Sequence, residues 1–311
     1  MPSHPLPPYP KSPPAGLFPP PATETGLQGW LSRWWPSTTI RRDPLAGQLV
    51  DRRYAPIPLI GWKLLPWIYR RLAAQRVAAE LSFTPGARLT VIVPVRDREH
   101  HLAQLLPRLR AKLREQAIAH RILVVEQSPG GLFNKGVLFN AAFRVAADSC
   151  DYVCLHDVDA VPIEANYGCP SEPLRLVTRL VGSRHGGERG ERYFGGSISL
   201  KREHFQAANG FSNLYWGWGK EDDDFLFRLW FSGRVCYADQ QGTFEDLPNP
   251  ADQQVHFTKL RKPDTLRANR RRRSLLMRGL LDFRNDGLGD VSYPVARVGG
   301  GADYERVVVS I

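Results

Sequence analysis

The chain has 311 residues, enough for one large domain or two small ones. Hydrophobic residues make up 42% and aromatic residues 10%, which excludes a disordered chain. The net charge of +11 favours anionic partners such as nucleotide diphosphates, lipid phosphates, acidic glycans or nucleic acid.

The four cysteines show no Cys-x-x-Cys spacing, so we expect no zinc site. They are too few for a disulfide framework, although a single bridge stays open. No secretory signal is visible, and no apolar run approaches the roughly 18 to 20 residues of a membrane span. We therefore expect a cytoplasmic protein.

The N-terminal part divides by composition. Residues 1–26 are rich in proline and predict a disordered tail. Residues 27–87 mix tryptophan with arginine, which indicates a strap packed on the core or, alternatively, a surface that rests on a membrane. The remaining residues, 88–311, predict one folded domain with two halves, about 88–165 and 166–311.

Strands and helices alternate in the first half of this domain. β-branched runs predict strands, and leucines at helical spacing predict the first helix. The predicted order is strand 89–95, helix 99–114, strand 121–125, helix 134–147 and strand 151–155. This order predicts an α/β fold with a doubly wound, mostly parallel sheet.

The pattern becomes mixed after Pro162. We expect a strand at 193–200, helices at 202–208 and 222–230, and a terminal hairpin of 291–298 with 304–309. Residues 259–278 carry nine basic residues. Without a nucleic-acid motif, this run favours a solvated helix face, or contact with lipid phosphate or an acidic acceptor, over a nucleic-acid footprint.

Two carboxylates follow the strand at 151–155. Asp157 and Asp159 sit where open α/β sheets bind ligands, and their spacing predicts that they lie on the same side of an extended segment with Val158 turned away between them. Oxygen ligands of this type hold Mg²⁺ or Mn²⁺, which in turn bridge a diphosphate. An isolated Asp-x-Asp is usually a solvated turn, but at a strand end before Ala-Val-Pro it favours a nucleotide-sugar transferase.

A second acidic signature is the decapeptide from Tyr215 to Asp224. Two tryptophans alternate with glycines, and four carboxylates follow directly. Adjacent carboxylates repel one another, so they need a cation, helix N-terminal amides or a catalytic role. The plain alternative is the acidic first turn of a helix. The upstream Asp157 and Asp159 favour the functional interpretation.

Together these motifs resemble the β-1,4-galactosyltransferases, metal-dependent inverting enzymes with a GT-A fold. The resemblance covers about residues 88–311 and keeps every motif in the family's order. The matching segments are 91–98, 133–135 (Phe-Asn-Lys where the family has Phe-Asn-Arg), 157–159, 193–196, 209–211, 215–224 and 286–288. It implies a Rossmann-like donor half, about 88–165, and a mixed acceptor half, about 166–311.

The resemblance implies a donor site for UDP-galactose. Its residues would be Pro94, Arg96, Arg98, Phe133, Lys135, Asp157, Val158, Tyr193, Gly196 and Trp218. A tyrosine at the position of Tyr193 is found in galactose-transferring members and would exclude a 2-acetamido group. This favours UDP-galactose, while UDP-GalNAc, UDP-glucose and UDP-xylose stay open as donors.

The acceptor site follows from the same resemblance. Trp218 would belong to a loop that closes over the donor. Asp222 and Asp223 would bind acceptor hydroxyls, Glu221 would assist, and Asp222 would act as general base. Neighbouring carboxylates are expected to raise the pKa of Asp222 toward a useful value.

The metal site is where the chain departs from the family. Asp159 would ligate Mn²⁺, but the family's Met-x-x-His has no clear counterpart. His256, with Gln253 at the methionine position, is the expected equivalent, although residues 241–252 resemble an insertion. A glutamine in place of the thioether would relax the preference for Mn²⁺ and admit Mg²⁺.

These expectations define a first hypothesis and its rivals. The first is inverting transfer of galactose to a sugar acceptor in glycan or glycolipid synthesis, by a bacterial-type enzyme that touches the inner membrane face. The rival from another class is a catalytically silent subunit of a polysaccharide-assembly complex. A nucleic-acid-binding module ranks last.

Overall fold

The computed structural model of the protein describes residues 49–50, 81–182, 187–188, 194–232, 234, 236–239, 241–248, 263–277, 281–301 and 303–311. The expected Pro-rich tail, 1–26, and most of the strap, 27–87, lie outside these residues. From the strap, β1 (Leu49–Val50) pairs with β12 (Tyr237–Asp239), and β2 (Phe83–Thr84) pairs with β7 (Cys169–Pro170).

A nine-stranded mixed sheet forms the centre of the fold. Its spatial order is β1, β12, β8, β11, β5, β3, β4, β15 and β14. The central strands are β5 (Tyr152–His156), β3 (Leu89–Val95) and β4 (His120–Gln127). β3 pairs in parallel with both neighbours, which is the doubly wound arrangement predicted from the sequence.

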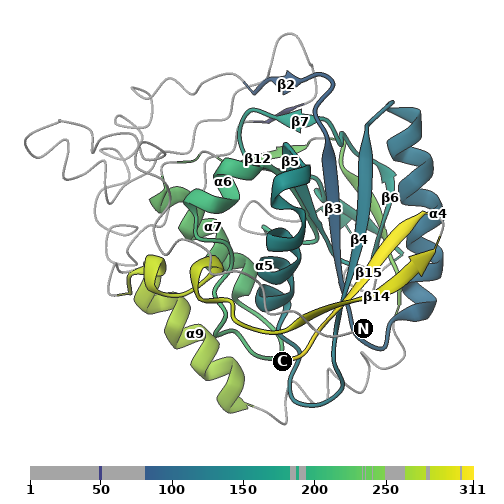
Figure 1. Cartoon of the computed structure of the whole chain (residues 1–311). Coiled ribbons are helices and arrows are strands. Elements are labelled where there is room, and N and C mark those ends of the chain that lie inside the picture. The colour runs from purple at the N-terminus through teal and green to yellow at the C-terminus, as the bar shows by residue number, and fades with distance from the viewer. Residues whose placement is uncertain are drawn as a thin grey trace, which may run out of the picture.

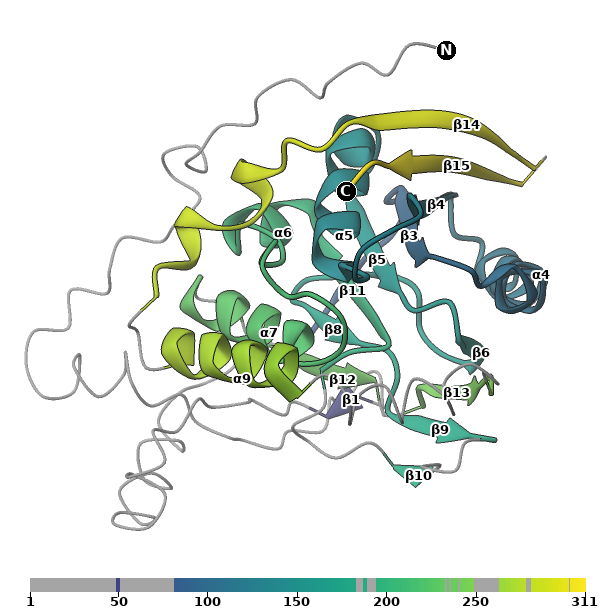
Figure 2. The same ribbon diagram turned by 90° about the horizontal axis from the view of Figure 1, so that it is seen from below.

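Helices cover both faces of these strands, as Figure 2 shows. α4 (Glu99–Glu115) buries its leucines against one face, and α5 (Lys135–Ala146) packs on the other. A short 3-10 turn, η1 (Ala147–Ser149), follows α5. Because helices cover both faces of β3, none of its residues is exposed, and its sequence is a nearly continuous apolar run.

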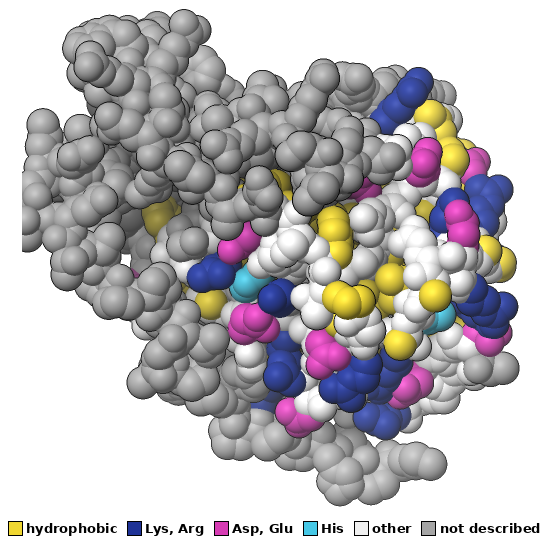
Figure 3. All heavy atoms as spheres, turned by 90° about the horizontal axis from the view of Figure 1, so that it is seen from above, with side chains coloured by type: hydrophobic (Ala, Val, Ile, Leu, Met, Phe, Trp, Pro, Cys, Tyr) yellow, Lys and Arg dark blue, Asp and Glu magenta, His cyan; other side chains and the backbone are white. Residues whose placement is uncertain are grey.

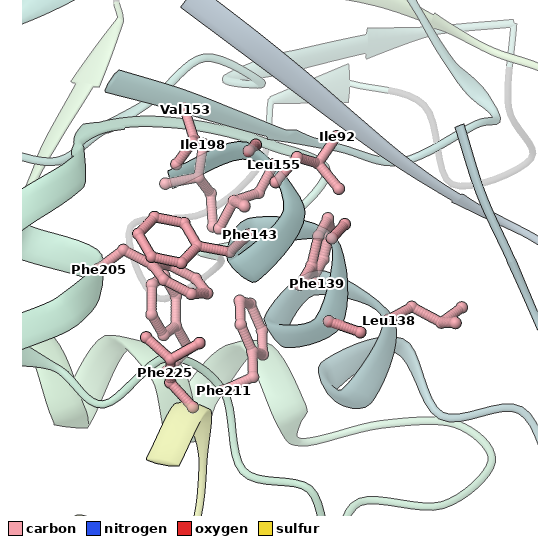
Figure 4. Close-up of a cluster of buried hydrophobic side chains, with 14 of the residues drawn as sticks. Ile92, Leu138, Phe139, Phe143, Val153, Leu155, Ile198, Phe205, Phe211 and Phe225 are labelled. Carbon is pink, nitrogen blue, oxygen red and sulfur yellow. The ribbon is translucent and has the colours of Figure 1, made fainter. Parts of the chain in front are cut away.

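The core under α5 is rich in phenylalanine. Figure 4 shows the rings gathered between α5 and the acceptor half. Phe211 and Phe225 stack with ring centroids 4.2 Å apart, and Phe143 and Phe205 lie 4.5 Å apart. This cluster joins the two halves of the domain into one core, since its rings come from both.

The acceptor half adds strands of both directions. β11 (Ser197–Lys201) runs antiparallel to β5 and to β8 (Leu174–Arg175). A separate four-stranded sheet contains β10 (Gly187–Glu188), β9 (Arg179–Val181), β13 (Thr243–Asp246) and β6 (Ala160–Glu164). This confirms a mixed second half, but its short strands were not predicted individually.

Three helices and a hairpin complete the described chain (Figure 1). The helices are α6 (Arg202–Ala207), α7 (Glu221–Phe231) and α9 (Pro263–Met277). Two 3-10 turns, η2 (Phe283–Asn285) and η3 (Leu288–Asp290), lead into β14 (Val295–Gly301) and β15 (Tyr304–Val309).

Two boundaries differ from the sequence prediction. The hairpin begins at Val295 rather than at residue 291, because η3 and Pro294 precede it. The strand expected at 193–200 begins at Ser197. Residues 241–252, expected as an insertion, contain β13, whose Phe244 is fully buried.

Other sequence expectations concern cysteines, membranes and surface charge. All four cysteines are buried and free. Within the described ranges no helix is long and apolar enough to cross a membrane. On the face in Figure 3, basic and acidic side chains of the described residues lie next to one another.

Candidate active site

Polar side chains gather at the carboxyl ends of β3 and β5. Arg96 and Arg98 follow β3, while Asp157 and Asp159 follow β5. Because these two strands are parallel neighbours, their ends meet at one edge of the sheet. Ligands of open α/β sheets bind at this edge.

Lys135 joins this edge to the start of α7. Its Nζ lies 2.8 Å from Asp222 Oδ1, 3.2 Å from Glu221 Oε1 and 3.5 Å from Asp157 Oδ1. The exposed fraction of the Lys135 side chain is only 12%. One ammonium group thus contacts carboxylates from two distant parts of the chain, which the sequence alone did not indicate.

The position of Lys135 is fixed by the start of α5. Asn134 caps this helix by accepting a hydrogen bond from Val137 N at 3.0 Å. The Asn134 amide also donates to the Asn213 carbonyl at 2.8 Å. Gly136 lets the two segments approach, since a Cβ there would lie 2.4 Å from the Ser212 carbonyl oxygen.

A buried ion pair within α7, between Asp224 and Arg228, lies at the acidic start of this helix. Asp224 accepts hydrogen bonds from Arg228 Nε at 2.5 Å and from the Tyr215 hydroxyl at 2.9 Å. Arg228 also donates to the Asp286 carbonyl at 2.6 Å. Asp224 therefore has a structural partner, while Glu221 and Asp222 face Lys135.

The electrostatics make Asp222 a weak acid. Burial in the first place, with the charges of Glu221 and Asp157, raises the pKa of Asp222 to about 8, although Lys135 opposes the rise. Neighbouring carboxylates contribute as the sequence predicted, but burial is the larger cause. For Lys135, burial acts to lower the pKa, and the surrounding carboxylates outweigh it, so the pKa is raised well above its ordinary value.

Asp157 and Asp159 lie in a turn after β5, not in an extended segment as expected. Val158 between them is buried in the core, so its side chain does turn away. Burial raises the pKa of Asp157, and burial together with Asp157 raises the pKa of Asp159 to about 7. Arg98 opposes the shift at Asp159.

Asp246 is a further acidic neighbour of Asp159. β13 pairs with β6 so that Asp246 lies opposite Ala160, and the next amide, Leu247 N, donates to the Asp159 carbonyl at 2.9 Å. The Asp246 charge also raises the pKa of Asp159. Among the described residues, no group of three or more His, Cys, Asp or Glu side chains could hold a metal ion.

The other expected donor residues fall near this edge. The Arg96 guanidinium lies 5.4 Å from the Phe133 ring centroid and donates to the Gly130 carbonyl at 3.3 Å. Pro94 is the last but one residue of β3 and lies opposite Val125 of β4. The Gly196 carbonyl accepts a hydrogen bond from Asp157 N at 2.6 Å. Gly196 therefore borders Asp157, and Arg96 and Phe133 lie beside each other.

The tryptophan loop, residues 215–220, lies directly before α7. Trp218 is 57% exposed, and Gly217 N donates to the Phe133 carbonyl at 2.8 Å. Asp223, expected at the acceptor, pairs with Lys220 at 3.0 Å and with Arg273 of α9 at 2.9 Å. The loop thus connects the donor edge with α9.

Some predicted residues lie outside the described part of the chain, and some described ones were missed. Tyr193, His256 and Gln253 belong to the former group, so their roles stay predictions. The latter are Asp246, which lies near Asp159, and two residues of α9, Asn269 beside the tryptophan loop and Arg273 beside Asp223. A short strand carries Asp246 and a basic run carries the other two, and neither pattern signals a site.

Sequence comparison identifies the class of protein. Residues 80–170 match the model of the N-terminal region of glycosyl transferase group 7, and residues 183–243 match that of the N-terminal domain of galactosyltransferase. The chain is 33% identical to β-1,4-galactosyltransferase 7 of Drosophila melanogaster over 215 residues, which are 68% of this chain and 64% of that protein. The human counterpart is 34% identical over 172 residues, 53% of this chain and 52% of that protein.

Solved structures agree with the sequence comparison. The catalytic domain of the Drosophila β-1,4-galactosyltransferase 7 in complex with xylobiose superimposes with a TM-score of 0.56 at 28% identity, covering 72% of this chain and 93% of that one. A mutant of that enzyme in complex with manganese, UDP-Gal and xylobiose gives the same score at 27% identity.

The sheet order and the site at its carboxyl edge define a GT-A-like fold. The chain belongs to the glycosyltransferase group 7, or β-1,4-galactosyltransferase, family. It spans between half and two thirds of the length of the two curated relatives named above.

Proposed function

We propose that the protein is a glycosyltransferase that transfers galactose from UDP-galactose to a hydroxyl group of a sugar acceptor, with inversion at the anomeric carbon. The observation that carries the proposal is the contact of Lys135 with Asp157, Glu221 and Asp222. It brings an expected donor-binding carboxylate and the expected base to one ammonium group. The relationship to β-1,4-galactosyltransferases supplies the reaction class.

Asp222 would act as the general base. A carboxylate with a pKa of about 8 accepts a hydroxyl proton more readily than an ordinary one. The acceptor oxygen forms a bond to the anomeric carbon, its proton passes to Asp222, and the bond from that carbon to the diphosphate oxygen breaks. UDP leaves with the electron pair. Glu221 and Asp223 would bind neighbouring acceptor hydroxyls.

The donor would bind along the sheet edge. Arg96 and Arg98 provide positive charge for the phosphates, and Phe133 provides an apolar ring beside them. Val158 is buried, so its contribution would come from its main chain. Trp218 would cover the bound sugar, and Tyr193 would select galactose.

Two described carboxylates have the chemistry that a divalent cation needs, and its further ligands would come from outside the described residues. Asp159 and Asp246 supply carboxylate oxygens, which suit Mn²⁺ or Mg²⁺. When bound, the cation would neutralise charge on the leaving diphosphate. His256 and Gln253 would contribute further ligands if they approach this point. We propose Mn²⁺ as the cofactor, with Mg²⁺ as a substitute.

We further propose that the acceptor is a lipid-linked glycan at the cytoplasmic face of a membrane. The exposed Arg267, Arg270 and Arg271 on α9 support it, since arginine attracts anionic lipid. Sedimentation with vesicles that contain or lack anionic phospholipid tests this part. Equal binding to both kinds of vesicle would contradict it.

A panel of UDP-sugars tests the proposed reaction. The purified protein would be given UDP-galactose, UDP-GalNAc, UDP-glucose and UDP-xylose with Mn²⁺, Mg²⁺ or EDTA, and xylose, glucose and GlcNAc as acceptors. We expect metal-dependent UDP release from UDP-galactose alone, and acceptance of UDP-GalNAc in Tyr193→Leu. No turnover and no metal-dependent UDP binding would favour a catalytically silent subunit instead.

A further inference from the structure

One buried side chain of α9 bonds to the tryptophan loop rather than to its own helix. Asn269 is 3% exposed. Its Nδ2 donates to the Trp216 carbonyl at 3.2 Å and to the Gly219 carbonyl at 3.0 Å. Both amide hydrogen bonds of Asn269 are therefore made to a single turn of another segment. Their acceptors lie on either side of Trp218 in the sequence.

The turn depends on outside partners for its shape. Gly217, Gly219 and Lys220 have φ values of 72°, 100° and 82°, all in the left-handed region. For Lys220, which has a side chain, this conformation costs free energy unless the surroundings hold it. A turn built of such residues has other conformations available, so the bonds from Asn269 select one of them.

The loop is held on two opposite sides. On the donor side, Gly217 N donates to the Phe133 carbonyl at 2.8 Å. On the α9 side, Asn269 donates to the Trp216 and Gly219 carbonyls, and Leu266 of α9 lies beside Gly219. Trp218 stays 57% exposed between these supports.

We propose that Asn269 is a positioning residue for the reaction. Through the Trp216 and Gly219 carbonyls it sets the loop conformation in which Trp218 meets the nucleotide sugar and the acceptor. The inference rests on the proposed function, because it assigns the catalytic use of the loop to Trp218. It gives α9, which the sequence indicated only as a basic run, a part in the site.

A double-mutant cycle between Asn269 and Trp218 tests this role. Asn269→Leu keeps a similar volume, removes both donors and leaves two carbonyls without partners. We expect kcat/KM for galactose transfer to fall about tenfold, in line with the loss of buried hydrogen bonds. In a Trp218→Ala background the same change should lower kcat/KM less than about twofold, because the side chain it positions is gone.

Two further variants make the cycle interpretable. Asn269→Gln keeps the amide donors and should recover part of the lost activity. Ala268→Ser, at an exposed neighbouring position of α9, should leave kcat/KM unchanged. Equal losses from Asn269→Leu with and without Trp218 would overturn the positioning role, because they would show a general effect on the fold.

Hydrogen exchange gives a readout that needs no catalysis. The Gly217 amide, bonded to the Phe133 carbonyl, reports on the loop. We expect peptides covering 215–220 to exchange at least about fivefold faster in Asn269→Leu, with α5 unchanged. Unchanged exchange of the loop would overturn the inference. If the wild-type protein turns over no UDP-sugar, the proposed function fails, and the exchange result alone decides whether Asn269 holds the loop.

Discussion

The ammonium group of Lys135 lies 2.8 Å from a carboxylate oxygen of Asp222, although the two residues are far apart in the chain. The cap at Asn134 fixes one partner, and the anchor between Asp224 and Arg228 fixes the other. This contact opposes the rise that burial causes in the pKa of the proposed base.

The first prediction concerns the pH dependence of transfer. Lys135 lowers the pKa of Asp222, so Lys135→Met should raise that pKa above its value of about 8. A base must be ionised to act, so the acid limb of the profile of kcat against pH should move to higher pH. Lys135→Arg keeps the charge and should leave the limb nearly in place. Identical profiles for Lys135→Met and the wild type would contradict the coupling.

The second prediction concerns the metal site. If Asp159 and Asp246 both hold the cation, Asp159→Asn and Asp246→Asn should each weaken Mn²⁺ binding in the presence of UDP by at least tenfold, measured by calorimetry. Asp239→Asn is a control, since Asp239 accepts hydrogen bonds from Asn166 N and Gln241 N. Wild-type affinity in Asp246→Asn would remove that residue from the site.

The third prediction concerns the buried ion pair between Asp224 and Arg228 of α7. Asp224 and Arg228 are each 2% exposed, so Arg228→Met leaves a buried carboxylate without its cation. We expect the free energy of unfolding to fall by about 3–5 kcal/mol. Arg284→Gln removes a pair with the more exposed Asp282 and should cost at most about 1 kcal/mol. Urea denaturation measures both, and similar losses would refute the distinction.

The fourth prediction concerns the pH dependence of stability. Burial, with Arg234 and Lys201, lowers the pKa of His204 to about 3. Below about pH 6.5 the unfolded state binds a proton at His204, whereas the folded state keeps this side chain neutral down to about pH 3. The free energy of unfolding is therefore highest above pH 6.5 and decreases as the pH falls. His204→Gln should flatten the decline in unfolding free energy between pH 6.5 and 4.5. His100→Gln, at an exposed position, should not.

The donor half was predictable from the sequence because its strands are buried on both faces. The five elements expected between residues 89 and 155 all occur, with ends within two residues. In the acceptor half, strands such as β8 have only two residues, too few for a periodic pattern. The resemblance supplied the mixed architecture there, but not the individual strands.

The same contrast holds for the site. Asp157, Asp159 and Asp222 were predicted because carboxylates stand out after a strand or before a helix and match the family's motifs, and their roles stay predictions. Asp246 and Asn269 were missed, since their positions depend on strand pairing and helix docking that no local pattern encodes. Burial of Asp222, the main cause of its raised pKa, likewise follows from tertiary structure.

The most direct test of the account measures galactose transfer and donor binding in Asp222→Asn. We expect kcat to fall by about 10²–10⁴, the contribution of a general base, while the Kd for UDP-galactose with Mn²⁺ stays within about threefold of wild type. A kcat within tenfold of wild type, with donor binding intact, would contradict the assignment of Asp222 as the base.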